Sequence, residues 1–170
     1  YTDEWVAEAE RRGLYNLRST PDALPCFVAE KNLRLFTRHG IFTEEEMRSR
    51  YRILLEGYAK TLHVEAKTLG VMVRQEFLPP LMNYLDRTTA SVGATLALNG
   101  SAVHARRAAL AEKLALYYEA VDAAEETLER DLAGAEELAR DGDAVETARY
   151  YLGTVLAVME RVRRAADEAE

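Results

Sequence analysis

The sequence predicts an all-α protein, in which long antiparallel helices form a bundle behind a smaller helical N-terminal section. Apolar residues recur at steps of three and four over several long stretches, which is the spacing of one helix face. No stretch alternates between apolar and polar residues for long enough to predict a strand. Hydrophobic residues make up 48% of the 170 residues and charged residues 30%, which is typical of a globular domain with a substantial core.

The N-terminal section comprises residues 1–42 and is predicted to contain short helices. The first ends at Gly13, because cations in the last turn and a glycine just beyond it are typical of a helix C-terminus. A second helix begins at Ser19, where a hydroxyl cap precedes a proline in the first turn, and it ends at His39-Gly40. The rest of the chain, residues 43–170, is predicted to form the bundle domain.

The bundle opens with a long helix. Thr43-Glu44-Glu45-Glu46 forms a capping box, in which the side chains of the first and last residues satisfy each other's backbone amides. Pro79-Pro80 predicts a kink or a break in this helix, because neither proline can donate a backbone hydrogen bond. The helical spacing of apolar residues stops near Asn99-Gly100. The predicted buried face contains Met47, Tyr51, Leu54, Tyr58, Leu62, Leu69 and Met72.

Two more helices complete the predicted bundle. The first opens at Ser101, and Asp141-Gly142-Asp143 forms the turn that separates it from the last helix. The helices pack on each other through apolar stripes at a shallow crossing angle. The predicted stripes are Leu110, Leu114, Tyr117, Val121, Leu128 and Leu132 in the first of these helices, and Val145, Ala148, Leu152, Val155, Leu156, Met159 and Val162 in the last.

The sequence predicts no catalytic, cofactor-binding or metal-binding residue. The histidines, His39, His63 and His104, lack the Glu-x-x-His spacing that places two ligands on one helix face, and no glycine-rich phosphate loop is present. Glu65 lies among apolar positions and is expected to be half-buried and paired with a cation, with a functional carboxylate as the alternative. Cys26, the only cysteine, is expected to be a buried apolar filler. The tyrosines are expected mostly at the core edge.

The charge pattern excludes several partners. The net charge of −7 argues against a broad nucleic-acid surface, which needs a basic face. No apolar run of membrane-spanning length and no signal peptide is present, so we expect no membrane and a cytoplasmic location. The arginine clusters lie among acids, which predicts ion pairs on solvated helix faces: Arg48, Arg50 and Arg52; Arg106 and Arg107; and Arg161, Arg163 and Arg164.

The chain contains a series of short motifs: Tyr1-Thr2-Asp3-Glu4-Trp5, Arg12-Gly13-Leu14, Asp22-Ala23-Leu24-Pro25, Glu30-Lys31-Asn32, Glu46-Met47-Arg48-Ser49-Arg50-Tyr51 and Val64-Glu65-Ala66. Together they resemble the end of the catalytic domain and the helical C-terminal extension of type III glutamine synthetases. Their order and spacing carry the resemblance, which is densest over the first half of the chain. Because the chain starts with Tyr1 and ends in a charged helix-like stretch, we expect a C-terminal fragment of such a protein.

The resemblance implies a parent enzyme that joins ammonia to glutamate with ATP and a divalent metal, Mg or Mn, in a large homo-oligomer. The family's catalytic motifs lie upstream of Tyr1, so no catalytic residue maps onto this chain and no cofactor is expected in it. Its expected partners are the rest of the parent synthetase and the neighbouring subunits. The leading hypothesis is therefore a structural, assembly role, and the alternative is a binding module for a regulatory protein or peptide.

Overall fold

In the computed structural model, which describes residues 2–98 and 101–169, these residues form helices, turns and loops and no strand, as predicted. The division of the chain at residue 42 stays a prediction. The elements in chain order are α1 (Asp3–Arg11), α2 (Thr20–Phe27), α3 (Glu30–Arg38), α4 (Glu44–Met72), the π-helical turn η1 (Val73–Phe77), α5 (Leu78–Ala94), the short 3₁₀ helix η2 (Leu96–Leu98), α6 (Ala102–Asp141), α7 (Ala144–Tyr150), the π-helical turn η3 (Tyr151–Val155) and α8 (Leu156–Ala169).

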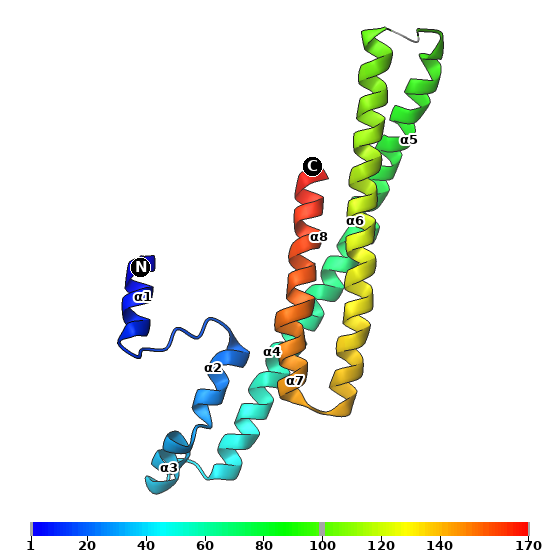
Figure 1. Cartoon of the computed structure of the whole chain (residues 1–170). Coiled ribbons are helices and arrows are strands. Elements are labelled where there is room, and N and C mark those ends of the chain that lie inside the picture. Colours follow the sequence, from blue (N-terminus) through cyan, green and yellow to red (C-terminus); the bar gives the residue numbers. More distant parts are fainter. Residues whose placement is uncertain (1, 99–100, 170) are drawn as a thin grey trace.

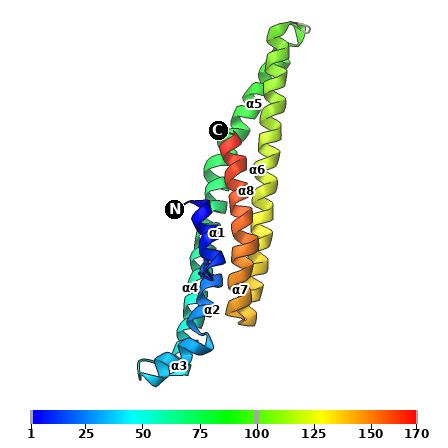
Figure 2. The ribbon, with the colours of Figure 1, turned by 60° about the vertical axis from the view of Figure 1, so that its left-hand side comes forward.

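The bundle consists of three helical rods (Figure 1). The first rod comprises α4, η1 and α5, the second is α6, and the third comprises α7, η3 and α8. The second rod runs antiparallel to the other two, packing on α5 along one part of its length and on α8 along another. The α5–α6 hairpin projects beyond the end of α8, so that part of the bundle is only two helices thick (Figures 1 and 2).

The N-terminal section contains one helix more than predicted. We expected a single helix from Ser19 to His39, but α2 ends at Phe27 and α3 begins at Glu30. The Asn32 side chain donates a hydrogen bond of 2.6 Å to the Cys26 carbonyl, which a continuous helix would have used internally. Helices α2 and α3 pack on α4, whereas α1 stands apart from the bundle and buries none of its residues (Figure 1).

The predicted helix starts are confirmed. The Thr43 amide donates to the Glu46 carboxylate at 2.8 Å, and the Glu46 amide donates to the Thr43 hydroxyl at 3.2 Å, which completes the capping box. The Ser101 side chain caps α6 and the Asp143 carboxylate caps α7. Gly142, between the two helices, has φ of 82°, a left-handed conformation that glycine adopts without strain. The predicted stop at Asn99-Gly100 lies outside the described residues.

The two prolines do not break the first rod. The π-helical turn η1 precedes them, and the Leu78 amide donates to the Val73 carbonyl five residues back. Pro79 and Pro80 then occupy the first turn of α5, where helix amides are not needed for the regular hydrogen-bond ladder. The π turn therefore accommodates two residues that would otherwise interrupt a regular helix.

The buried face of the first rod differs from the predicted one. Leu54 and Met72 were expected in the core, but half of each side chain is exposed. Ala59, Ala66 and Val73 are buried at steps of seven residues, and so are Leu81, Thr88 and Thr95 after η1. The step from Val73 to Leu81 across η1 is eight. The extra residue of the π turn keeps the same side of the rod against its neighbours. The buried positions are Met47, Leu55, Ala59, Leu62, Ala66, Gly70, Val73, Leu78, Leu81, Thr88 and Thr95.

The second and third rods bury most of their predicted stripes. Leu110 and Leu156 are the clearest departures, at 38% and 39% exposed. Tyr151 is 3% exposed, so this tyrosine lies in the core and not at its edge. The main core cluster joins all three rods and contains Ala59, Leu62, Ala66, Val73, Leu78, Val121, Leu128, Leu132, Ala135, Tyr151, Val155, Val158 and Val162. Within the described residues, every helix is too short or too polar to cross a membrane.

Candidate functional site

The residues singled out from the sequence do not converge on one site. Glu65 is exposed and makes no ion pair with any described residue, so the expected half-buried pair is wrong. His39 ends α3, and His104 lies 3.1 Å from the Thr95 hydroxyl where α5 meets α6. Cys26 is half-buried and not fully buried as predicted. The prediction that the chain holds no catalytic residue stays a prediction.

A buried acid that the sequence reasoning missed lies on α6. Glu125 is 5% exposed, and its carboxylate lies 2.8 Å from the guanidinium of Arg74, at the start of η1. Burial raises the pKa of Glu125, and the charge of Arg74 opposes that rise. A Cβ on Gly70 would lie 3.4 Å from the same carboxylate, so the glycine leaves room for the pair. The pattern contains the signal, because Glu125 continues the spacing of Val121, Leu128 and Leu132.

Four polar side chains from three rods meet at a second place. The Tyr151 hydroxyl lies 2.9 Å from Nδ1 of His63, and Nε2 of the same ring lies 3.7 Å from Glu136. Lys67 also pairs with Glu136, at 3.2 Å. The hydrogen bond and charge of Lys67 lower the pKa of Glu136, which holds this carboxylate ionised. Burial, and then the charge of Glu136, raises the pKa of Tyr151, which holds the phenol neutral.

Three of these side chains, His63, Glu136 and Tyr151, border a pocket at the end of the bundle where α6 turns into α7. Its volume is about 480 Å³, and its walls come from α4, α6, α7 and η3. Tyr151 and Thr147 line the inner side, while Lys60 and Arg140 line the pocket from α4 and α6. The Thr147 hydroxyl is buried and has no hydrogen-bond partner among the described residues. A concave site with few polar groups is the kind of place where small molecules bind.

The described residues do not fit the divalent metal that the family resemblance implies for the parent enzyme. Among residues 2–98 and 101–169, no three or more histidine, cysteine, aspartate or glutamate side chains gather closely enough to hold a metal ion. The pocket brings together His63, Glu56 and Glu136, but Arg52 lies 2.7 Å from Glu56, and Lys67 engages Glu136. Charge and geometry in this pocket therefore favour salt bridges over metal coordination.

All eight clustered arginines are exposed, as predicted, but ion pairs within the described residues form at only three of them, Arg48, Arg52 and Arg163. Arg106 and Arg107 instead donate to backbone carbonyls. Arg48 pairs with Glu44 at 2.7 Å, and Arg163 approaches Asp167 at 3.7 Å, each within one helix. The guanidinium of Arg50 lies over the ring of Phe42, 4.8 Å from its centroid. Exposed pairs of this kind contribute little to stability. The absence of a nucleic-acid partner stays a prediction.

One helix face is apolar and exposed. Ile53 and Val64 are each 61% exposed, and Leu54, Met72 and Val71 are between 44% and 50% exposed. With Gly57, Thr61 and Thr68, they follow the three- and four-residue spacing of one side of α4, which we call the α4 outer face. Both threonine hydroxyls donate to carbonyls of their own helix, at 3.1 Å and 2.8 Å, so neither hydroxyl needs water. No charged residue belongs to this face.

Comparison with known proteins gives one consistent answer. The family model described as the glutamine synthetase C-terminal domain matches residues 1–95. A glutamine synthetase of Butyrivibrio fibrisolvens is 40% identical over 170 residues, which is all of this chain and 24% of that protein. A type-3 glutamine synthetase of Dictyostelium discoideum is 36% identical over 96 residues, 56% of this chain and 13% of that protein. A glutamine synthetase of Bacteroides fragilis is 31% identical over 87 residues, covering 51% of this chain and 12% of that protein.

Proposed function

The chain belongs to the glutamine synthetase C-terminal domain family, and on that premise we propose that it is the structural helical region of an ATP-dependent glutamate–ammonia ligase and is not catalytic by itself. Its role is to pack against the catalytic part of the synthetase polypeptide and thereby to support the enzyme's oligomer. The chain spans about a quarter of the length of the Butyrivibrio relative, 24%. A cytoplasmic location, which the family resemblance implies, belongs to the same proposal.

The α4 outer face is the observation that carries the assembly role. It presents five large exposed apolar side chains on one side of α4, with Gly57, Thr61 and Thr68 between them, and Ile53 and Val64 are the most exposed of the five. Contiguous apolar surface of this kind marks interaction sites, because each Å² removed from water contributes roughly 25 cal/mol. Its proposed occupant is the catalytic part of the same synthetase, since relatives that match this chain are about four times its length. A neighbouring subunit is the other outcome of the test.

The test is made on the complete synthetase subunit that contains this sequence. Ile53→Asp combined with Val64→Asp places two charges on the α4 outer face without touching the buried core. We expect the mass measured by light scattering to fall below that of the unmodified oligomer, because burying an unpaired charge at an interface is costly. Limited proteolysis then separates the two occupants. Release of the C-terminal region within each subunit indicates the catalytic part, whereas intact but dissociated subunits indicate a neighbouring subunit.

A matched control comes from α6. Leu116 is 65% exposed, similar to the two replaced residues, but lies outside the α4 outer face. Leu116→Asp should leave the oligomer intact. An unchanged mass in the double variant, or the same dissociation in the Leu116 control, would show that the α4 outer face does not hold the assembly together.

The non-catalytic part of the proposal has a separate test. The purified chain, supplied with glutamate, ammonia, ATP and Mg²⁺ or Mn²⁺, is expected to form no glutamine above the rate without protein. The measurement is glutamine production followed against time and protein concentration. Turnover that scales with the amount of this chain would overturn the claim that it is not catalytic alone.

A second candidate function draws on the same face. An exposed apolar surface on one helix also suits an amphipathic segment of a regulatory protein, which binds by laying its own apolar face on such a surface. In that case the double aspartate variant keeps the oligomer and the activity of the synthetase but loses a regulatory response. The mass measurement therefore separates this function from the assembly role.

A further inference from the structure

The pocket between α4, α6 and α7 carries an inference of its own, because its lining groups are not all used in holding the fold together. Three rods contribute to it, so it forms only when the bundle is assembled. It lies where the second rod turns into the third, next to the π-helical turn that carries Tyr151. π-helical turns inside α-helices are frequent at functional sites. This inference does not depend on the assembly role.

Positive charge at the pocket is incompletely neutralised. Glu56 is paired with Arg52 at 2.7 Å, and Glu136 is shared among several cations. Lys60 makes no ion pair with any residue in the described part of the chain. Arg140 has one carboxylate neighbour, Glu136, at 4.0 Å, the same group that Lys67 approaches to 3.2 Å. Two cations are thus available for an anionic group, which a guanidinium and an ammonium both bind well.

The walls leave space for more than a simple ion. Ala59, Ala139 and Ala144 line the pocket together with Gly142, and these small residues account for its width. Its volume of about 480 Å³ is that of a small-molecule site, far more than a chloride or a single phosphate requires. The methyl groups offer contact to a flat apolar body. The lining therefore combines an anion-binding side with an apolar one.

The inner wall holds polar groups that the fold does not require. Thr147 is 5% exposed, and its hydroxyl has no partner among the described residues. Buried hydroxyls in native proteins nearly always have partners, and an unpaired one destabilises the folded state. The Tyr151 hydroxyl beside it contacts His63 at 2.9 Å and retains further hydrogen-bonding capacity. These features are the mark of a wall shaped for a ligand and not for stability alone.

We propose that this pocket binds a small organic acid, with its carboxylate between Lys60 and Arg140 and its apolar body against the alanines of α4, α6 and α7. The two cations provide the selection for a negative charge. The small side chains set the size of the body that fits. Thr147 and Tyr151 line the same pocket, and the Tyr151 hydroxyl has hydrogen-bonding capacity beyond its contact with His63.

The probe is benzoate, which has one carboxylate and a flat apolar ring, and its uncharged analogue is benzamide, which has the same shape. Each is titrated into the isotope-labelled chain, and amide resonances are followed by NMR. We expect benzoate to cause saturable shifts at Gly142, Ala144 and Thr147. Binding of benzamide should be weaker by roughly tenfold or more, because the charged hydrogen bonds are lost.

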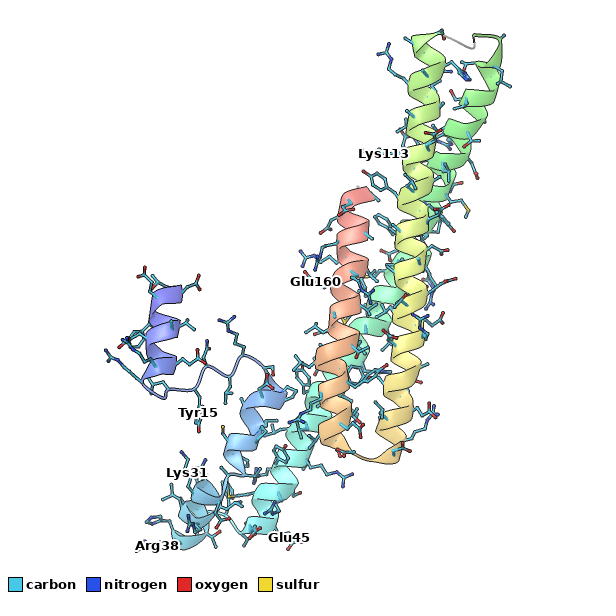
Figure 3. All side chains as sticks on the ribbon, viewed as in Figure 1. Tyr15, Lys31, Arg38, Glu45, Lys113 and Glu160 are labelled. Atoms are coloured by element: carbon cyan, nitrogen blue, oxygen red, sulfur yellow. The ribbon has the colours of Figure 1, made fainter. Side chains whose placement is uncertain are left out.

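Lys60→Gln and Arg140→Gln should each weaken benzoate binding by roughly tenfold, because each removes one of the two cations. Both residues are exposed, so the NMR spectrum of each free variant should remain that of a folded protein. Lys113→Gln is the matched control, since Lys113 lies on α6 far from the turn into α7 (Figure 3), and it should bind benzoate like the unmodified chain. The proposal is overturned if benzoate gives no saturable shift at the pocket, if benzamide binds equally well, or if all three variants behave alike.

Discussion

The guanidinium of Arg74 lies 2.8 Å from the carboxylate of Glu125 and joins the first rod of the bundle to the second. The two residues differ in environment, since the Glu125 side chain is 7% exposed and that of Arg74 is 46% exposed. Arg74 also reaches Glu129, at 3.2 Å. The arginine therefore neutralises a buried acid from the solvent side, at the point where the first rod has its π-helical turn.

Arg74→Gln should destabilise the chain at neutral pH by about 1–3 kcal/mol, because it leaves the Glu125 charge buried without its partner. The double variant Arg74→Gln/Glu125→Gln should recover part of that loss, since no buried charge remains. Urea unfolding measures both. Arg34→Gln is the control, because its pair with Glu30 is exposed on both sides and should change stability by less than about 1 kcal/mol. Equal losses in Arg74→Gln and the double variant would contradict the prediction.

The same pair predicts a pH dependence. Burial raises the pKa of Glu125 above its unfolded value, so the folded state binds this proton more tightly than the unfolded state does. Protonation of Glu125 therefore favours folding. The stabilisation that comes from this bound proton is present in acid and is lost as the pH rises through the raised pKa of Glu125. Without Arg74 the pKa rises further. The deficit of Arg74→Gln should shrink as urea unfolding is repeated at decreasing pH, and a constant deficit would argue against a buried charge as its cause.

Substitutions at Gly134 and Tyr150 should have non-additive effects on the free energy of unfolding. A Cβ at Gly134 would lie 2.9 Å from the Tyr150 hydroxyl oxygen, and the next nearest atom is the Cζ of the same ring, at 3.5 Å. Replacing glycine by alanine inside a helix normally raises the free energy of unfolding by about 1 kcal/mol. Gly134→Ala should not bring this increase, because the new methyl group would clash with the Tyr150 hydroxyl. In the Tyr150→Phe background that gain should return, because the clashing oxygen is gone. Thermal unfolding of the four variants measures the coupling.

Gly57→Ala is the control for this cycle, because Gly57 lies in α4 and a Cβ there would meet nothing within 4 Å. It should stabilise the chain by up to about 1 kcal/mol in either background. If Gly134→Ala stabilises the unmodified chain as much as Gly57→Ala does, the close approach of the Tyr150 hydroxyl has no energetic consequence.

Thr43→Ala removes the N-terminal cap of α4 and should lower the free energy of unfolding by about 1 kcal/mol. Hydrogen bonds from the Thr43 amide and then from its hydroxyl lower the pKa of Glu46 in the folded state. The stabilisation that ionised Glu46 gives the folded state is therefore present above the pKa of Glu46 in the unfolded chain, and it is lost as the pH falls through the lower pKa of the folded state. The difference between variant and unmodified chain should therefore shrink in acid. Thr61→Ala, which affects no cap, should not destabilise the isolated chain. Helicity followed by circular dichroism during urea unfolding gives both results.

Thr147→Val should stabilise the chain by about 1 kcal/mol, because it removes a buried hydroxyl that has no described partner and keeps the shape of the side chain. Thr88→Val is the matched control. Thr88 is also buried, but its hydroxyl donates to the Tyr84 carbonyl at 2.8 Å, so its replacement should bring no such gain. Thermal unfolding measures the stability of both variants. Equal changes in stability would show that the unpaired Thr147 hydroxyl does not destabilise the folded state.

Local patterns in the sequence were sufficient for much of the architecture. The capping box at Thr43, the start at Ser101 and the turn at Gly142 depend on neighbours a few residues away, and all three are confirmed. Helical class and antiparallel order follow from apolar periodicity and short turns. The break between α2 and α3 was missed because it depends on the Asn32 side chain reaching the Cys26 carbonyl, which periodicity does not reveal.

Candidate functional groups were harder to predict than helices. The sequence drew attention to Glu65 on an apolar stripe, but the buried face of α4 is turned away from it, and Glu65 is exposed. Glu125 occupies a core position on α6 and could have been identified from its spacing. The sequence did not connect His63 with its partner Tyr151, because the two residues are 88 positions apart along the chain.

The sequence by itself determined that this chain forms long helices, where most of them begin, and which protein family it resembles. The tertiary structure decided which side of each helix is buried, and it placed a π-helical turn before Pro79-Pro80 so that one side of the first rod stays against its neighbours. It also brought His63, Glu136 and Tyr151 together around a pocket. The reason is physical: capping and periodicity act within a few residues, whereas burial and pairing depend on contacts between helices distant in the chain.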